Sequence, residues 1–157
     1  MVVKSPAESQ LAETLSALEQ SLLSPMVSGE IRQWTRNVQE RCSTLSVDVA
    51  TYQRNVLHVQ YAEIAKNAPE FAKQLTNLTE ADGWILGDVS EFLKQLHFFG
   101  EVADKADPQK IETALESNRK KTVDMGLNLI LGIRKQQAEA NTWFAESQFR
   151  DLGVGAD

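Results

Sequence analysis

The chain has 157 residues, a formal net charge of −6, and 42% hydrophobic against 24% charged residues. These values are typical of a folded domain and argue against extensive disorder, and the negative charge disfavours nucleic acid or an anionic membrane as the main partner. A single cysteine, Cys42, excludes a disulfide within the chain and is typical of a reducing compartment. The amino terminus has no apolar core of signal-peptide length, and the most apolar run, Met125 to Ile133, is far shorter than a membrane span. We therefore expect one cytoplasmic domain over residues 1–157.

The positions of the prolines predict the helices. Proline is tolerated at the first turn of a helix or outside it, and rarely in its interior. All four prolines lie at the edges of long stretches with helical apolar spacing, namely Pro6, Pro25, Pro69 and Pro108. The sequence therefore predicts four helices, near residues 6–24, 29–66, 69–104 and 108–150.

Caps and apolar spacing support the first two helices. Ser5-Pro6-Ala7-Glu8 is a capping box with proline at the first helical position. The second helix carries a heptad seam with alternating steps of four and three residues. Its members are Ile31, Thr35, Val38, Cys42, Leu45, Val49, Tyr52, Val56 and Val59, and Glu63 is the next position on it.

The seam of the third helix is apolar except at one position. Its members are Phe71, Leu75, Leu78, Asp82, Ile85, Val89, Phe92, Leu96 and Phe99. A carboxylate on such a seam is costly unless it is paired or hydrogen-bonded. We favour pairing of Asp82 with an Arg, Lys, Tyr or Trp of a facing helix, or its exposure to water, over a role as a ligand or acid/base group. The tryptophans Trp34, Trp84 and Trp143 are expected in the core or at seam edges.

The fourth helix is apolar around most of its circumference between Val123 and Ile133. Such a helix is buried on more than one side, either in the middle of the bundle or at a second interface. We expect self-association through this belt, with Val123, Leu127, Ile130 and Leu131 as interface residues.

Short connections between the helices favour an all-α, up-down-up-down four-helix bundle, left-handed, with antiparallel neighbours. The first helix is much shorter than the others, so the four cannot pack flush. We expect an overhang, a break near Gly83 or Gly126, or a dimer that covers the excess.

The residues show no constellation for catalysis. A ferritin-like di-iron site needs two Glu-x-x-His pairs, and the residues three before His58 and His97 are Asn55 and Lys94. The histidines also lack the following lysine that is typical of a phosphotransfer bundle, although a phosphorylated histidine remains a third alternative. We therefore expect no metal, no cofactor and no enzymatic activity. The alternative is a metal or small-ligand site in a mid-bundle cavity that uses Asp82, Tyr52, Glu63 and His58.

The stretch from Leu23 to about Leu96 resembles bacterial hemerythrin-like domains, which are four-helix bundles. The likeness lies in the order of segments and in the phrases Tyr61-Ala62-Glu63-Ile64 and Ala68-Pro69-Glu70, followed by Leu75 to Trp84. The resemblance implies a di-iron centre whose ligand pairs would fall near Tyr52 and Val56 and near Ala81 and Asp82. These residues lack the family's ligands, so the resemblance implies a scaffold that has filled its metal pocket. We accordingly expect a non-catalytic binding module whose partner is a second copy or another protein.

Overall fold

A computed structural model describes residues 4–25, 29–105 and 111–151, with side chains described for 115–149 of the last range. Within these ranges the chain is helical and contains no strand. The helices are α1 (Pro6–Leu23), α2 (Ile31–Tyr52), α3 (His58–Asn67), α4 (Ala72–Lys105) and α5 (Ile111–Asp151). A π-helical turn, η1 (Gln53–Leu57), joins α2 to α3, and a 3-10 turn, η2 (Pro69–Phe71), precedes α4.

The predicted all-α fold is confirmed, with four long helical segments near the predicted boundaries. Ser5 caps α1 as predicted, because its Oγ accepts a hydrogen bond from the backbone N–H of Glu8, 3.2 Å away. Pro6 and Pro69 occupy the first positions of their helical segments. The predicted start of the last helix, at 108–110, lies outside the described residues.

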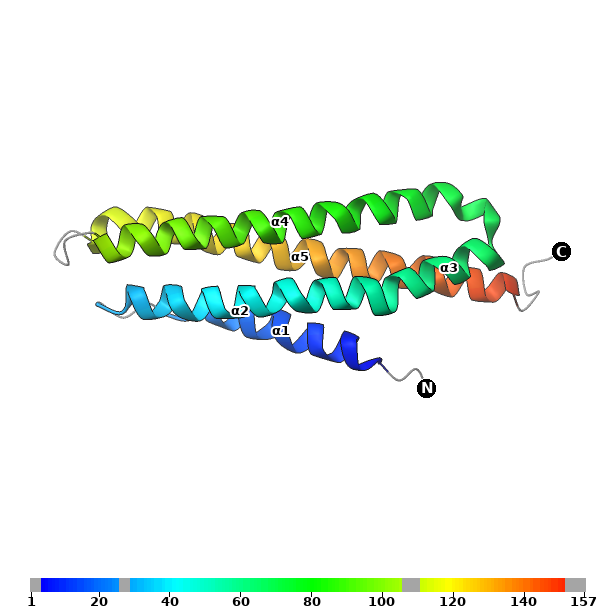
Figure 1. Ribbon diagram of the computed structural model, residues 1–157, viewed down its shortest axis with the longest axis horizontal. Helices are drawn as coiled ribbons and strands as arrows, with labels where there is room; N and C mark the ends of the chain where they lie inside the picture. Colours follow the sequence, from blue (N-terminus) through cyan, green and yellow to red (C-terminus); the bar gives the residue numbers. More distant parts are fainter. Residues whose placement is uncertain (1–3, 26–28, 106–110, 152–157) are drawn as a thin grey trace.

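The long segments lie side by side, and α1 is the short one (Figure 1). It has 18 residues, against 34 in α4 and 41 in α5. It packs mainly on α2 and also touches α5, while α2 packs on α4 and α4 on α5. Figure 1 shows that α1 lies along only part of the molecule, so the far end consists of α3, α4 and α5. This is the overhang that unequal helix lengths predicted.

The core is one continuous cluster that contains most of the predicted seam residues. Leu11, Leu15, Leu18 and Leu22 of α1 are each at most 1% exposed, as are Phe92 and Leu96 of α4. The helices α4 and α5 run unbroken through Gly83 and Gly126, so the predicted break at these glycines is wrong. At Gly126 the missing side chain permits close approach, because a Cβ there would lie 2.6 Å from Leu22 Cδ1 and 2.9 Å from Phe92 Cζ.

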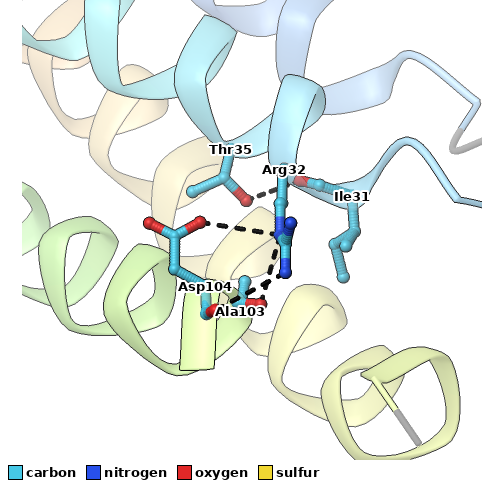
Figure 2. Close-up of polar contacts among 5 residues, drawn as sticks. All are labelled: Ile31, Arg32, Thr35, Ala103 and Asp104. Atoms are coloured by element: carbon cyan, nitrogen blue, oxygen red, sulfur yellow. Dashed lines mark hydrogen bonds and ion pairs between the residues drawn. The ribbon is translucent and has the colours of Figure 1, made fainter. Parts of the chain in front are cut away.

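An arginine joins α2 to the end of α4 (Figure 2). The guanidinium of Arg32 donates to the carbonyl oxygens of Ala103 (3.4 Å) and Asp104 (3.5 Å) and lies 3.6 Å from the Asp104 carboxylate. The last carbonyls of a helix have no partner within the helix and carry partial negative charge, so a cation is favoured there. Both side chains are about half exposed, so the ion pair itself adds little stability. The hydrogen bonds to the two carbonyls connect the start of α2 to the end of α4.

Candidate functional site

The only π-helical turn among the described residues lies beside Asp82, the anomalous position of the third seam. The five residues of η1 hold one more residue than an α turn would, and π turns are frequent at functional sites. The extra residue rotates the following helix, so the buried positions after Tyr52 are Gln53, Leu57, Tyr61 and Ile64. The prediction that the seam continues through Val59 is therefore wrong, since Val59 is 56% exposed.

The π turn brings polar groups from three helical segments to Asp82, which is 4% exposed. The Tyr61 hydroxyl donates to Oδ2 at 2.8 Å, and Gln136 Nε2 on α5 donates to Oδ1 at 3.0 Å. The same Gln136 nitrogen donates to the Leu78 carbonyl, and Gln53 Nε2 donates to the Asp82 carbonyl, each at 3.0 Å. We call Gln53, Tyr61, Asp82 and Gln136 the polar layer. Of the predicted alternatives, which were pairing with an Arg, Lys, Tyr or Trp or exposure to water, the structure shows pairing with a tyrosine.

Burial controls the protonation of this layer. Desolvation raises the pKa of Asp82, and the hydrogen bonds from Tyr61 and Gln136 and the nearby His58 oppose the rise. Desolvation and the hydrogen bond to Asp82 also raise the pKa of Tyr61. Desolvation, together with the charge of Glu8, raises the pKa of Tyr52 to about 12. Both phenols therefore stay protonated near neutral pH and are not nucleophiles, and the Tyr61 hydroxyl acts as a hydrogen-bond donor to Asp82.

The arrangement is suited to holding three helical segments together. Both oxygens of Asp82 are occupied, and the amides of Gln53 and Gln136 satisfy carbonyl groups of α4. No second carboxylate or imidazole takes part in these bonds. The geometry therefore offers no acid/base pair and no activated nucleophile.

The structure does not bring all four residues of the predicted alternative site together in one cavity. Tyr52 is 2% exposed and lies close enough to Asp82 for their charges to interact. Glu63 is on the surface, where its carboxylate accepts a hydrogen bond from Gln148 at 3.3 Å. His58 is exposed as well. The π turn explains the position of Glu63, because the rotation buries Ile64 in its place.

The donors of the polar layer do not fit a metal ion. Transition metals favour imidazole, thiolate and carboxylate ligands, whereas here one carboxylate is surrounded by amide and phenol groups. Within the described residues, no group of three or more His, Cys, Asp or Glu side chains could hold a metal ion. His97 is exposed and lies 3.3 Å from the Glu101 carboxylate on its own helix.

Gln53 and Gln136 were not predicted as members of this site. A signal for Gln136 was present, because it continues the apolar spacing of Leu129 and Ile133 that leads on to Ala140. The contribution of Gln53 depends on the π turn. A competing seam through Leu57, Tyr61 and Ile64, which avoids Glu63, was the available sign of that turn.

The raised pKa of Asp82 predicts a pH dependence of stability. Because folding raises this pKa, the native state binds the proton more readily than the unfolded chain, and Asp82 destabilises the fold increasingly as the pH rises from about 4 through the raised value. Asp82→Asn keeps polar partners for Tyr61 and Gln136 and removes the charge. We expect the variant to gain stability relative to the natural chain between about pH 4 and 7, measured by urea unfolding at each pH. A constant difference across this range would contradict the prediction, and Asp124→Asn controls for loss of a surface charge.

A second feature is an apolar groove on the outer side of α4 and α5, with a volume of about 510 Å³. Its floor consists of Phe92 and Leu129, and its sides include Ile85, Met125 and the open position at Gly132. Trp84 lies on the same face of α4 as the lining residues Asp88 and Glu91, at steps of four and three residues. Its side chain is 69% exposed, which corrects its predicted place at a seam edge. We call this groove together with Trp84 the outer surface.

The predicted interface residues of the last helix do not form one exposed patch. Ile130 is 1% exposed and belongs to the core, so its predicted interface role is wrong. Val123 and Leu127 are partly buried against that core. Leu131 is 62% exposed and is the most exposed of the four. The apolar belt is explained by the contacts of α5 with α1 and α4, which meet at Gly126 within the belt.

Comparisons of the chain with protein-family models, curated proteins and solved structures found no match. No helix in the described part of the chain is long and apolar enough to cross a membrane. Function is therefore inferred from the residues of this chain alone.

Proposed function

We propose that the protein is a non-catalytic helical-bundle interaction module that self-associates through the outer surface. The observation that carries the proposal is the exposure of Trp84 (69%) beside a groove with Met125 (41% exposed) at its side. Large exposed apolar side chains around a groove are typical of protein interaction sites, and Trp and Met are enriched at interfaces. The polar layer then has a structural role, which is to fix the rotation of α3 against α4 and α5.

The charges on the two sides of the groove favour a second copy as the partner. Asp88 and Glu91 line the α4 side. Lys121 and Lys135 lie at heptad spacing with Met125, Asn128 and Gly132 on the α5 side, and both lysines are exposed. A two-fold contact that places α4 of one copy over α5 of the other brings opposite charges together on both sides.

The same proposal includes the topology and handedness of the bundle and a cytoplasmic location. Short connections support an up-down-up-down, left-handed bundle with antiparallel neighbours. A hemerythrin-like ancestry would fit the positions of Tyr52 and Asp82, which stand where the resemblance places metal ligands and are both buried. The single, buried Cys42 supports a cytoplasmic location.

Sedimentation of the full chain over a range of concentrations tests the self-association. We expect a monomer–dimer equilibrium that Trp84→Glu shifts strongly towards monomer, because a charge would be buried in the contact. Val47→Glu is the matched control: Val47 is 65% exposed on α2, away from the outer surface, and its replacement should leave the equilibrium unchanged. A monomer at every concentration, or an equal effect of the two variants, would contradict the proposal.

A further inference from the structure

A larger cavity lies at the end of the molecule that α1 leaves uncovered. It has a volume of about 740 Å³, within the range of small-molecule sites. One side of it is formed by Lys4, Ser5 and Glu8, at the start of α1. Val56 and Gln60 form a second side, and Phe144 and Phe149 of α5 form a third. It lies where a longer α1 would have packed, and is separate from the outer surface.

The walls combine apolar side chains with polar atoms that lack partners. Phe144 and Val56 are partly buried against the core, and Phe149 is 56% exposed at the edge. Gln60 Oε1 is buried without a hydrogen-bond partner. The half-buried Glu8 carboxylate makes no hydrogen bond or ion pair with the rest of the described chain, so the return half of the predicted capping box is not formed. A buried acceptor without a donor is costly, and a ligand that donates hydrogen bonds would remove that cost.

The Tyr52 hydroxyl adds a third such atom next to the cavity. It is buried and forms no hydrogen bond of good geometry, although Gln137 lies near enough to oppose the rise of its pKa. The charge of Glu8, which lines the cavity, contributes to the raised pKa of this phenol, so the two groups are close. Burial keeps the phenol protonated and uncharged. The fixed negative charge on this side is therefore that of Glu8.

We propose that this cavity binds a small primary amine with an aromatic or branched aliphatic body. An ammonium group supplies three donors and a positive charge, which match the Glu8 carboxylate and the unpaired oxygen of Gln60. The faces of Phe144 and Phe149 attract a cation and cover the apolar body of such a ligand. Lys4 also lines the cavity, but its side chain is exposed and forms no ion pair with Glu8. An anionic ligand held by Lys4 is the competing outcome.

Isothermal titration calorimetry of the full chain with three probes of similar shape tests which ligand charge the cavity prefers. The probes are positively charged, negatively charged and neutral. We expect 2-phenylethylamine to bind at least about tenfold more tightly than 3-phenylpropanoate or 2-phenylethanol, because only the amine pairs with Glu8. Glu8→Gln should weaken binding of the amine by about tenfold or more and leave the alcohol unaffected. Glu13→Gln removes the same charge from an exposed position of α1 and should change neither.

A variant that fills the cavity provides a second test. Ala145 is an exposed lining residue, so Ala145→Trp should occupy the space without disturbing the core, and binding of the amine should be lost. Unchanged thermal unfolding of each variant shows that the fold is retained. Failure of the amine to bind, equal or tighter binding of the acid, or binding insensitive to both Glu8→Gln and Ala145→Trp would overturn the proposal. None of these results bears on the self-association of the outer surface.

Discussion

Deletion of Asn55 is expected to leave the fold intact and to convert the π turn into a continuous α-helix. Asn55 is exposed within η1, and the turn holds one residue more than an α turn. Removal of that residue restores a regular seam in which Leu57, Tyr61 and Ile64 keep their buried positions. The hydrogen bond from Gln53 to the Asp82 carbonyl would be lost, at a cost of about 1 kcal/mol.

Deletion of Ala62 is the matched control, because it also removes one exposed residue but lies in regular α-helix. The residues that follow would rotate, and Ala65 would replace Ile64, which is 0% exposed. The loss of a buried isoleucine costs about 2–5 kcal/mol in free energy of unfolding. Urea unfolding of both variants measures the difference. Equal destabilisation by the two deletions would show that the π turn does not absorb the extra residue.

Replacement of Gly126 by alanine is expected to destabilise the protein although alanine is the better helix former. The new Cβ would lie 2.6 Å from Leu22 Cδ1 and 2.9 Å from Phe92 Cζ, and both side chains are 1% exposed and closely packed, so they or their helices must shift. Overpacking of this kind costs about 1–3 kcal/mol, which exceeds the gain of up to about 1 kcal/mol from helix propensity. Thermal or urea unfolding measures the net loss.

Gly132 provides the control for this substitution. It lies on the same helix, and a Cβ there would meet nothing within 4 Å. Gly132→Ala should therefore stabilise the protein by up to about 1 kcal/mol. Combination of Gly126→Ala with Leu22→Ala should cost less than the sum of the single changes, because the truncated leucine makes room for the new methyl group. Stabilisation by Gly126→Ala would contradict the close approach of the three helices.

The fold could be predicted well because the signals for helix ends are local. Pro6 and Pro69 begin helical segments for steric reasons that need no knowledge of the partner helix. The sequence could predict that Asp82 has a hydrogen-bond partner, since a buried carboxylate requires donors. Its donors were not predictable in full, because Gln53 reaches α4 only through the π turn, and the sequence after Tyr52 offers two apolar seams.

The exposed sites were harder to predict, because they depend on how helices of unequal length align. A sequence pattern shows that Trp84 is near an apolar stripe, but only the packing of α5 on α4 decides on which side of the stripe it falls. The same holds for Ile130 and Leu131, which are adjacent in the chain and are 1% and 62% exposed. The cavity at Glu8 likewise exists because α1 begins at Pro6 and lies along only part of the molecule.

The limited length of α1 also gives the two ends of the molecule different local stabilities. Near Gly126 four helices share the core, whereas beyond Glu8 the described part of the chain provides only α3, α4 and α5. Local opening requires less free energy where fewer apolar contacts must separate. We therefore expect unfolding to begin at the end formed by α3 and the last turns of α5, and we expect a ligand in the cavity at that end to delay it.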